Sequence, residues 1–398
     1  MSAWLHIIGM GDNGVESLTP TARAVLDGAQ VIVGAERHHA LTEALDVQRL
    51  SWPSPFSALT QTLEKLRGKQ VVVLATGDPL WYSVGVNLAQ NFDPKDVVFH
   101  PQVSAFQLAA ARMGWGLSGV ETLTIHGRAP EVILPSLAPH QKLILLTAGA
   151  QCPGAVADLL KARGYGASKM TVLAHMGGVD EARFEGTADQ WSHVVPEFHS
   201  LAIDCILDAG AAPLPRFGLP DEVFVSDGTM TKRDIRALTV AKLMPMRDAL
   251  LWDIGCGSGS VAIEWMRSAQ DAKAIGIERR QDRRAMALEN AITLGAPTLK
   301  IINDDVPNAL SDLPAPDAVF IGGGLSHDTF EAAWAALKLH GRLVANAVTL
   351  EGEAVLLALF AKHGGDLSRI ALSRAEPVGR LKGWRAAMPV TQWSIVKL

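Results

Sequence analysis

The chain has 398 residues, of which 48% are hydrophobic and 19% charged. This length favours at least two domains, and the composition is typical of globular domains with large cores rather than of disordered chains. The formal net charge of −5 argues against a nucleic-acid partner, which needs a basic face. The three cysteines, Cys152, Cys205 and Cys256, are scattered, so we expect no metal, no disulfide framework and a reducing, cytoplasmic environment. No apolar run reaches membrane-spanning length, and the N-terminus lacks the basic start of a signal peptide, so we expect no membrane contact.

A glycine-rich turn follows the first apolar run, because the sequence GMGDNG occupies residues 9–14. A second run, QVVVLA at 70–75, lacks polar alternation, which is typical of a central parallel strand. It ends in Thr-Gly-Asp-Pro, and ligands bind at the carboxyl ends of such strands, so Asp78 is a candidate ligand residue. Ser104, before a helix expected over 105–113, is placed to cap that helix or to contact a ligand.

Residues 114–119, GWGLSG, look like a hinge between two lobes, which together form a domain over 1–208. Three prolines and two glycines, with few apolar residues, mark 209–222 as a linker to a second domain over 223–398. Further strands are expected over 31–33, 97–99, 121–125, 142–147, 170–174 and 201–207, helices over 19–29 and 156–161, and a hairpin or strand pair over 180–191.

The sequence LWDIGCGSGSVAIEW at 251–265 predicts a strand, a tight turn and a helix. The turn carries Gly255, Gly257 and Gly259, which suit a backbone that presses against a bound nucleotide. A dinucleotide site would need its third glycine at position 260, which is Ser260. The spacing therefore favours an adenosyl ligand without a pyrophosphate, that is, S-adenosylmethionine.

Acidic residues accompany this turn. Asp253, at the end of the strand, is placed to meet the cationic methionine end of such a ligand. Glu278 closes the next expected strand, about 20 residues beyond the glycines, where a carboxylate accepts both ribose hydroxyl hydrogens. Cys256 lies in the turn itself, either as a nucleophile or as a small side chain that fits beside the ligand.

Strands alternate with helices through the second half, which predicts an α/β, doubly wound parallel sheet. Seven strands with a closing antiparallel pair are expected, the usual architecture of S-adenosylmethionine methyltransferases. Thr231 is expected to cap the first helix, with Asp234 near a capping-box position. The strands are expected over 250–254, 274–277, 299–302, 318–321, 343–348, 368–375 and 390–397, and the helices over 235–243, 261–268, 283–294, 329–339 and 353–362.

Two later loops carry further candidates. Asp305 lies where the adenine is expected and either accepts the adenine amino hydrogens or belongs to an acidic turn in solvent. Gly322, Gly323 and Gly324 leave open space facing the sulfonium, as a bulky planar substrate requires. His327 follows them, either as a proton carrier or in a structural role at a helix start.

Four segments of the first half resemble the tetrapyrrole methylase family, and within it the subgroup that methylates a precorrin. They read GMGDNG (9–14), LATGDPLWYSVG (74–85), HPQVSAFQLAAARMGW (100–115) and TIHGR (124–128), and the resemblance covers roughly residues 3–208. It implies two α/β lobes with S-adenosylmethionine between them and, since the family is usually dimeric, a homo-oligomer. It also implies cofactor contacts from Gly9, Gly11, Asp78, Ser104 and Ala105.

The second half, over about 215–398, resembles the decarboxylating precorrin methyltransferases that act at carbon 15. The resemblance is carried by DGTMTKRDIRAL, LWDIGCGSGSVAIEW, GIE and DAVFIGGG. It implies cofactor contacts from Thr231, from the turn residues Gly255, Cys256, Gly257, Ser258 and Gly259, and from Glu278 and Val306.

Both halves in this order resemble fused enzymes of the aerobic cobalamin pathway, which methylate carbons 5 and 15 of a precorrin and remove a carboxylate. The resemblance implies two S-adenosylmethionine sites, with the first domain acting at carbon 5 and the second at carbon 15. Because a precorrin is a polyacid, local cations are needed, and the candidates are Arg112, Arg128, Lys232 and Arg233. The alternatives are a methyltransferase for RNA or another small molecule, a tetrapyrrole-binding scaffold with one inactive domain and, more distantly, a nicotinamide dehydrogenase.

Overall fold

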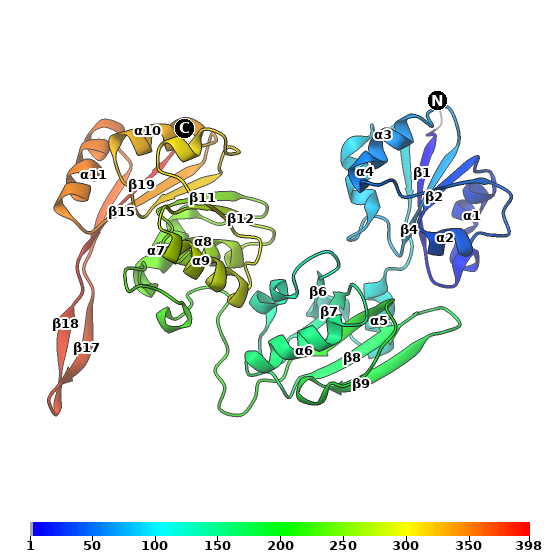
Figure 1. Cartoon of the computed structure of the whole chain (residues 1–398), viewed down its shortest axis with the longest axis horizontal. Coiled ribbons are helices and arrows are strands. Elements are labelled where there is room, and N and C mark those ends of the chain that lie inside the picture. The colour runs from blue at the N-terminus through cyan, green and yellow to red at the C-terminus, as the bar shows by residue number, and fades with distance from the viewer. Residues whose placement is uncertain (1–2) are drawn as a thin grey trace. The chain divides into compact units, whose positions relative to one another are not determined.

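The computed structural model describes residues 3–398, which divide into two compact units. Unit 1 comprises the residues up to Pro130 together with Ala138–Pro213, and unit 2 comprises Glu131–Leu137 together with Leu214–Leu398. Each unit is built from α/β layers, as the sequence predicts (Figure 1). Within the described residues, no helix is both long and apolar enough to cross a bilayer.

The first lobe of unit 1 is an all-parallel sheet in the order β3-β2-β4-β1-β5. Side chains that alternate along β1 enter two different cores, since Leu5 and Ile7 pack in one and Ile8 and Met10 in the other. Both faces are therefore buried, which explains the continuous apolar strands. The elements are β1 (Leu5–Met10), η1 (Gly14–Ser17), α1 (Pro20–Asp27), β2 (Val31–Gly34), α2 (Glu36–Ala40), β3 (Gln48–Ser51), η2 (Phe56–Ala58), α3 (Leu59–Glu64), β4 (Val71–Thr76), α4 (Val84–Asn91) and β5 (Val97–His100).

The second lobe is a mixed sheet in the order β6-β7-β10-β8-β9, in which only β6 and β7 are parallel. The expectation of a hairpin or strand pair within 180–191 was wrong, because this stretch holds one strand, β9, which pairs with the preceding β8. The elements are α5 (Ala105–Met113), η3 (Leu117–Gly119), β6 (Val120–Thr124), η4 (Pro130–Ser136), β7 (Lys142–Leu146), α6 (Cys152–Ala162), β8 (Lys169–Ala174), β9 (Ala182–Thr187), η5 (Ala188–Gln190) and β10 (His199–Asp204).

Unit 2 is a seven-stranded sheet in the order β13-β12-β11-β14-β15-β19-β16, closed by antiparallel pairing of β19 with both neighbours. The predicted architecture is therefore confirmed. Leu251 of β11 enters the core beneath α7, α8 and α9, whereas Trp252 enters the core beneath α10 and α11. The elements are η6 (Asp221–Val223), α7 (Arg233–Leu243), β11 (Leu250–Ile254), α8 (Ser260–Ser268), β12 (Lys273–Ile277), α9 (Gln281–Thr293), β13 (Lys300–Ile302), η7 (Asn308–Leu310), β14 (Ala318–Ile321), α10 (His327–Ala336), β15 (Arg342–Ala347), α11 (Leu350–His363), β16 (Asp366–Ile370) and β19 (Val390–Val396).

A two-stranded hairpin, β17 (Ser373–Val378) and β18 (Leu381–Ala386), projects from the sheet of unit 2 (Figure 1). The sequence predicts one strand over 368–375, but the structure ends β16 at Ile370 and starts the hairpin afterwards. Leu381 and Trp384 are about four-fifths exposed on it.

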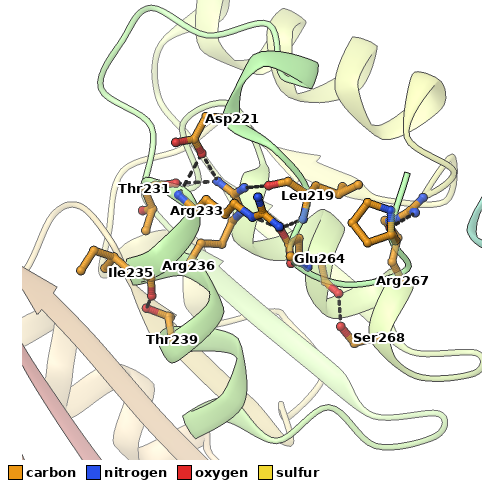
Figure 2. A network of polar contacts seen from close by, with 12 residues as sticks. Leu219, Asp221, Thr231, Arg233, Ile235, Arg236, Thr239, Glu264, Arg267 and Ser268 are labelled. Carbon is orange, nitrogen blue, oxygen red and sulfur yellow. Dashed lines mark hydrogen bonds and ion pairs between the residues drawn. The ribbon is translucent and has the colours of Figure 1, made fainter. Parts of the chain in front are cut away.

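A fully buried ion pair holds the first segment of unit 2 against helices α7 and α8. Arg236 of α7 donates from Nε to Oε1 of Glu264 on α8 at 2.7 Å, and neither side chain is exposed. Glu264 also accepts the backbone N–H groups of residues 218 and 219, and Arg236 donates to Asp221 at 3.0 Å (Figure 2). The segment 214–222, where the sequence predicts most of the linker, is thus packed into unit 2 by two charged side chains.

Candidate functional site

The glycine turn of unit 2 joins β11 to α8 at the carboxyl edge of the parallel strands. Gly255, Gly257 and Gly259 all have positive φ, at 69°, 54° and 77°. A Cβ on Gly255 would lie 2.6 Å from the Cα of Gly323, so two loops touch through their backbones there. A Cβ on Gly257 would meet open space instead. The turn is therefore packed against the protein at Gly255 and faces open space at Gly257.

Asp253 lies beneath this turn and is completely buried. Its Oδ2 accepts the backbone N–H of Ala262 at 2.9 Å, whereas Oδ1 finds no hydrogen-bond partner within residues 3–398. Burial, with the charge of Glu278 nearby, raises the pKa of Asp253 to about 7. An unpaired, buried carboxyl oxygen is costly, which marks Asp253 as a functional candidate.

Glu278 follows β12 and binds back to the turn. Its Oε2 accepts the backbone N–H of Gly257 at 3.1 Å, and its Oε1 accepts that of Arg280 at 2.9 Å. The carboxylate is 7% exposed. It therefore keeps a fixed orientation beside the open face of Gly257, where the sequence predicts a ribose.

Cys256 and Ser258 occupy the turn between the glycines. Burial raises the pKa of the Cys256 thiol far above its usual range, which does not suit a nucleophile. Its sulfur fills the space beside Gly276, where a Cβ would lie only 2.7 Å from Sγ. Ser258 is buried, and its Oγ lacks a partner among the residues described. After Oδ1 of Asp253, Oγ of Ser258 is thus the second buried polar atom of this site without a hydrogen-bond partner, and it lies on the same turn as Gly257.

The loops after β13 and β14 face each other near Val306. A Cβ on Gly324 would lie 2.9 Å from Cγ2 of Val306. Asp305 is exposed, with Oδ1 3.6 Å from Nε of Arg279. His327 is the exposed first residue of α10, whose N-cap is Ser326. Gly322 and Gly323 hydrogen-bond to the end of β11, so these loops belong to the same sheet edge as Asp253.

The start of α7 differs from the expectation. Lys232, not Thr231, is the N-cap residue, and its side chain makes no capping bond. Oδ1 of Asp221 accepts the backbone N–H of Arg233 at 2.9 Å, and the carbonyl of Thr231 accepts Arg236 at 2.7 Å. The cap is supplied from a distant segment, which a local motif cannot reveal. Lys232 and Arg233 are both exposed.

In unit 1, three loops meet around Gly77. A Cβ on Gly9 would lie 2.3 Å from the carbonyl oxygen of Gly77, so this close approach requires glycine. A Cβ on Gly77 would lie 3.5 Å from the backbone nitrogen of Ala105. Oδ1 of Asp78 accepts the backbone N–H of Leu80 at 2.8 Å, which shapes the loop after β4.

Ser104 caps α5 in a full capping box. Its Oγ accepts the backbone N–H of Gln107 at 3.2 Å, and Oε1 of Gln107 accepts the backbone N–H of Ser104 at 2.8 Å. The first of the two roles expected for Ser104 is confirmed. Gly11 faces its own turn, because a Cβ there would lie 2.8 Å from Oδ1 of Asn13.

The two candidate cations of unit 1 differ in their partners. Arg112 forms a two-pronged ion pair with Glu181 and holds the pKa of that carboxyl at about 2. Its charge is therefore already matched by a protein group. The guanidinium of Arg128 lies over the ring of Tyr82, 5.8 Å from its centroid.

A polar cluster joins the two lobes of unit 1 and was not predicted. Asp12 accepts Nε of Arg37 and lies 3.1 Å from Nδ1 of His175, and Arg37 also donates to Thr76 at 2.9 Å. The guanidinium of Arg37 stacks on Phe198 at 4.0 Å. Asp12 lies in the GMGDNG turn, but His175 is 163 residues away, so no local signal pairs them.

Comparisons with known proteins agree with both folds. A family model described as tetrapyrrole (corrin/porphyrin) methylases matches residues 4–191, and one described as a precorrin methyltransferase domain matches residues 222–397. A cobalt-precorrin-7 C(5)-methyltransferase of Salmonella typhimurium is 33% identical over 42% of this chain and 83% of its own. A probable cobalt-precorrin-6B C(15)-methyltransferase (decarboxylating) of Pyrobaculum calidifontis is 29% identical over 44% of this chain and 92% of its own.

A full-length relative decides the family. The precorrin-6Y C(5,15)-methyltransferase [decarboxylating] of a Sinorhizobium species is 42% identical over 100% of this chain and 97% of its own. Similarity of this extent covers both units and all the loops described above. The chain therefore belongs to the family of decarboxylating precorrin-6Y C(5,15)-methyltransferases.

Proposed function

We propose that this protein methylates precorrin-6Y at carbons 5 and 15 and removes the carboxylate of its ring C acetate, giving precorrin-8 in cobalamin biosynthesis. The observation that carries the proposal is the presence of both folds of the family in one chain, each with a glycine-rich turn at the carboxyl edge of a parallel sheet. Relatives named for the carbon-5 and the carbon-15 reaction each match somewhat less than half of the chain. This supports one reaction for each unit.

The residues of unit 2 fit S-adenosylmethionine. Oδ1 of Asp253 and Oγ of Ser258 are buried without partners in the described part of the chain, and Gly257 faces open space. Asp253 is suited to the cationic methionine end, Glu278 to the ribose hydroxyls, and Asp305 with the backbone of Val306 to the adenine. The sulfonium supplies an activated methyl group when it is bound. The protein then has to hold the carbon nucleophile in line and exclude water, which needs no side-chain nucleophile.

A second donor site is proposed in unit 1, around Gly9, Gly11, Asp78, Ser104 and Ala105. Its support is the convergence of the turn after β1, the loop after β4 and the start of α5 around Gly77. No metal is assigned a role in either site.

Cations are proposed to bind the substrate carboxylates. Arg128 in unit 1, and Lys232 and Arg233 in unit 2, are retained for this role. Arg112 is retained as well, with its pairing to Glu181 to be exchanged for a substrate carboxylate. In unit 2 the glycines at 322–324 leave room for the ring, and His327 is proposed to carry the proton that replaces the lost carboxylate.

Self-association and a cytoplasmic location complete the proposal. The hairpin exposes the large apolar side chains of Leu381 and Trp384. Exposed apolar side chains of this size are more typical of a surface that another molecule covers than of one that faces solvent. The three free cysteines suit a reducing compartment. Light scattering of the full chain tests self-association: a mass near 42.5 kDa contradicts it, and a multiple supports it.

Incubation of the full chain with precorrin-6Y and a methyl-labelled donor tests the reaction. We expect two labelled methyl groups and one carbon dioxide for each substrate molecule. In the Glu278→Gln variant, we expect loss of the carbon-15 methyl and retention of the carbon-5 methyl. A product of the wild type that carries only one labelled methyl, or that forms without loss of carbon dioxide, contradicts the proposal.

A further inference from the structure

The first turn of helix α9 carries two adjacent arginines, Arg283 and Arg284, which contact different loops of the proposed donor pocket. Nε of Arg283 donates to Oδ2 of Asp227 at 2.8 Å, and its Nη2 donates to Oγ1 of Thr229 at 2.8 Å. Both Asp227 and Arg283 have side chains that are 23% exposed. The segment 226–231, which also carries Thr231, is therefore held against the start of α9.

Arg284 is the next residue and contacts another pair of loops. Its Nη1 donates to the carbonyl of Glu278 at 3.1 Å, to the carbonyl of Arg279, and to Oδ1 of Asn303 at 2.7 Å. The first two acceptors follow β12, and the third follows β13. A single guanidinium thus holds Glu278, the residue proposed to bind the ribose, at a fixed distance from the loop after β13, where the adenine is expected.

The placement of these charges is unfavourable for the helix alone. The amino end of a helix carries partial positive charge, so arginines in its first turn are disfavoured there. Asp282 lies in the same turn but is paired with Arg280, and Arg279 is paired with Asp305, so none of these charges offsets Arg283 and Arg284. Such a conflict between local preference and structure is expected where function requires it. Both arginines are half-buried and in contact with solvent, where an ion pair contributes less to folding stability than a fully buried one.

We infer that Arg283 and Arg284 are positioning residues for the donor pocket of unit 2, which set the loops after β12, after β13 and before α7 at the separation that the adenosyl group needs. The inference rests on the proposed function, because it takes those loops as the donor-binding loops. Asn290 of α9 supports the same arrangement, since it binds both Val225 and the carbonyl of Ser258. Helix α9 is thus the common support of four segments around the pocket.

The test compares Arg283→Gln and Arg284→Gln in the full-length protein, with carbon-15 methylation measured over a range of S-adenosylmethionine concentrations. Each variant loses charge-assisted hydrogen bonds, so we expect KM for the donor to rise about tenfold while kcat changes less than about twofold. Arg283→Lys retains the charge toward Asp227 and is expected to fall between the wild type and Arg283→Gln. Asp227→Asn tests the same contact from the other side, should Arg283→Gln fold poorly.

Arg369→Gln is the matched control, since Arg369 pairs with Glu353 at 2.8 Å on elements that carry none of the donor loops. We expect its KM to equal that of the wild type. A fall in kcat at unchanged KM, a loss of thermal stability at unchanged KM, or an equal rise in KM for Arg369→Gln overturns the inference. If the wild type itself transfers no methyl to carbon 15, the proposed function has failed instead.

Discussion

Gly255 and Gly323 approach so closely that a Cβ on Gly255 would lie 2.6 Å from the Cα of Gly323. Gly255 also has a φ of 69°, which L side chains rarely adopt. The contact brings the turn after β11 and the loop after β14 together at one sheet edge. The proposed donor pocket and the proposed opening for the macrocycle are therefore joined through two glycine backbones.

Substitution of Gly255 is expected to damage folding and donor binding together. Gly255→Ala adds a clash and a strained φ, which we expect to destabilise unit 2 by about 1–3 kcal/mol. Gly257→Ala provides the comparison, because it imposes a similar strained φ of 54° but a Cβ there meets only open space. We expect Gly257→Ala to cost less stability yet still weaken donor binding, as measured by thermal unfolding and titration calorimetry. Equal melting temperatures for the two variants, both lower than that of the wild type, would contradict this reading.

Asp253 is expected to make the stability of unit 2 depend on pH. Its pKa is raised from 3.8 to about 7, so between these values the folded protein keeps a proton that the unfolded chain has released. The free energy of unfolding therefore falls as pH rises through this window, by roughly 4 kcal/mol when complete. Asp253→Asn removes the titration, so the variant should be more stable than the wild type at pH 8 and equal to it near pH 4. Parallel pH profiles for the two proteins would rule this out.

The same carboxyl is expected to link donor binding to pH. A cationic ligand favours the ionised form of Asp253, so its affinity in unit 2 should increase as pH rises from about 6 to 8. In Asp253→Asn this increase should disappear and the affinity should be lower throughout. Calorimetric titration at several pH values measures both effects. A pH-independent affinity in the wild type would remove Asp253 from the proposed site.

The buried pair of Arg236 and Glu264 is expected to be essential for the fold of unit 2. Glu264→Gln removes the fully buried charged partner of Arg236 and leaves the guanidinium with only the partly exposed Asp221, which should cost about 3–5 kcal/mol. Replacing both residues by apolar ones of similar size should cost less than the single change, since the only carboxylate that then loses its partner, Asp221, is in contact with solvent. Denaturant unfolding of the two variants measures the difference. A single variant as stable as the wild type would show that the pair does not support the segment 214–222.

Ser104 allows its two expected roles to be separated. Ser104→Ala removes the cap of α5 and should cost about 1 kcal/mol. Ser104→Asn supplies another capping side chain, so it should restore stability. If Ser104 also contacts the donor, the KM for S-adenosylmethionine in carbon-5 methylation will be higher in Ser104→Asn than in the wild type, although stability is restored. A normal KM in Ser104→Asn would limit Ser104 to the capping role.

Local patterns explain what the sequence reveals of this fold. The glycine turn after β11 and the apolar run of β4 are contiguous, so their spacing alone predicts strand, turn and helix. Strand β3 was missed because its residues, QRLS, show no apolar alternation and are only partly buried. The hairpin β17–β18 was not predicted as a separate unit for a related reason, since its strands are almost wholly exposed and show no apolar alternation.

The polar contacts that the sequence did not predict join residues far apart in the chain. Arg236 and Glu264 are 28 residues apart, and Asp12 and His175 are 163 residues apart, so neither pairing has a periodic signal. The sequence also cannot show that the α7 amino end is capped by Asp221 rather than by Thr231. These contacts depend on the tertiary fold, which brings together charges that are far apart in the sequence.

Titration of the full chain with S-adenosylmethionine tests the central claim most directly, because the account requires one donor site in each unit. We expect two sites for each wild-type chain, with one of them weakened in Gly257→Ala and the other unchanged. A single site in the wild type would contradict the account.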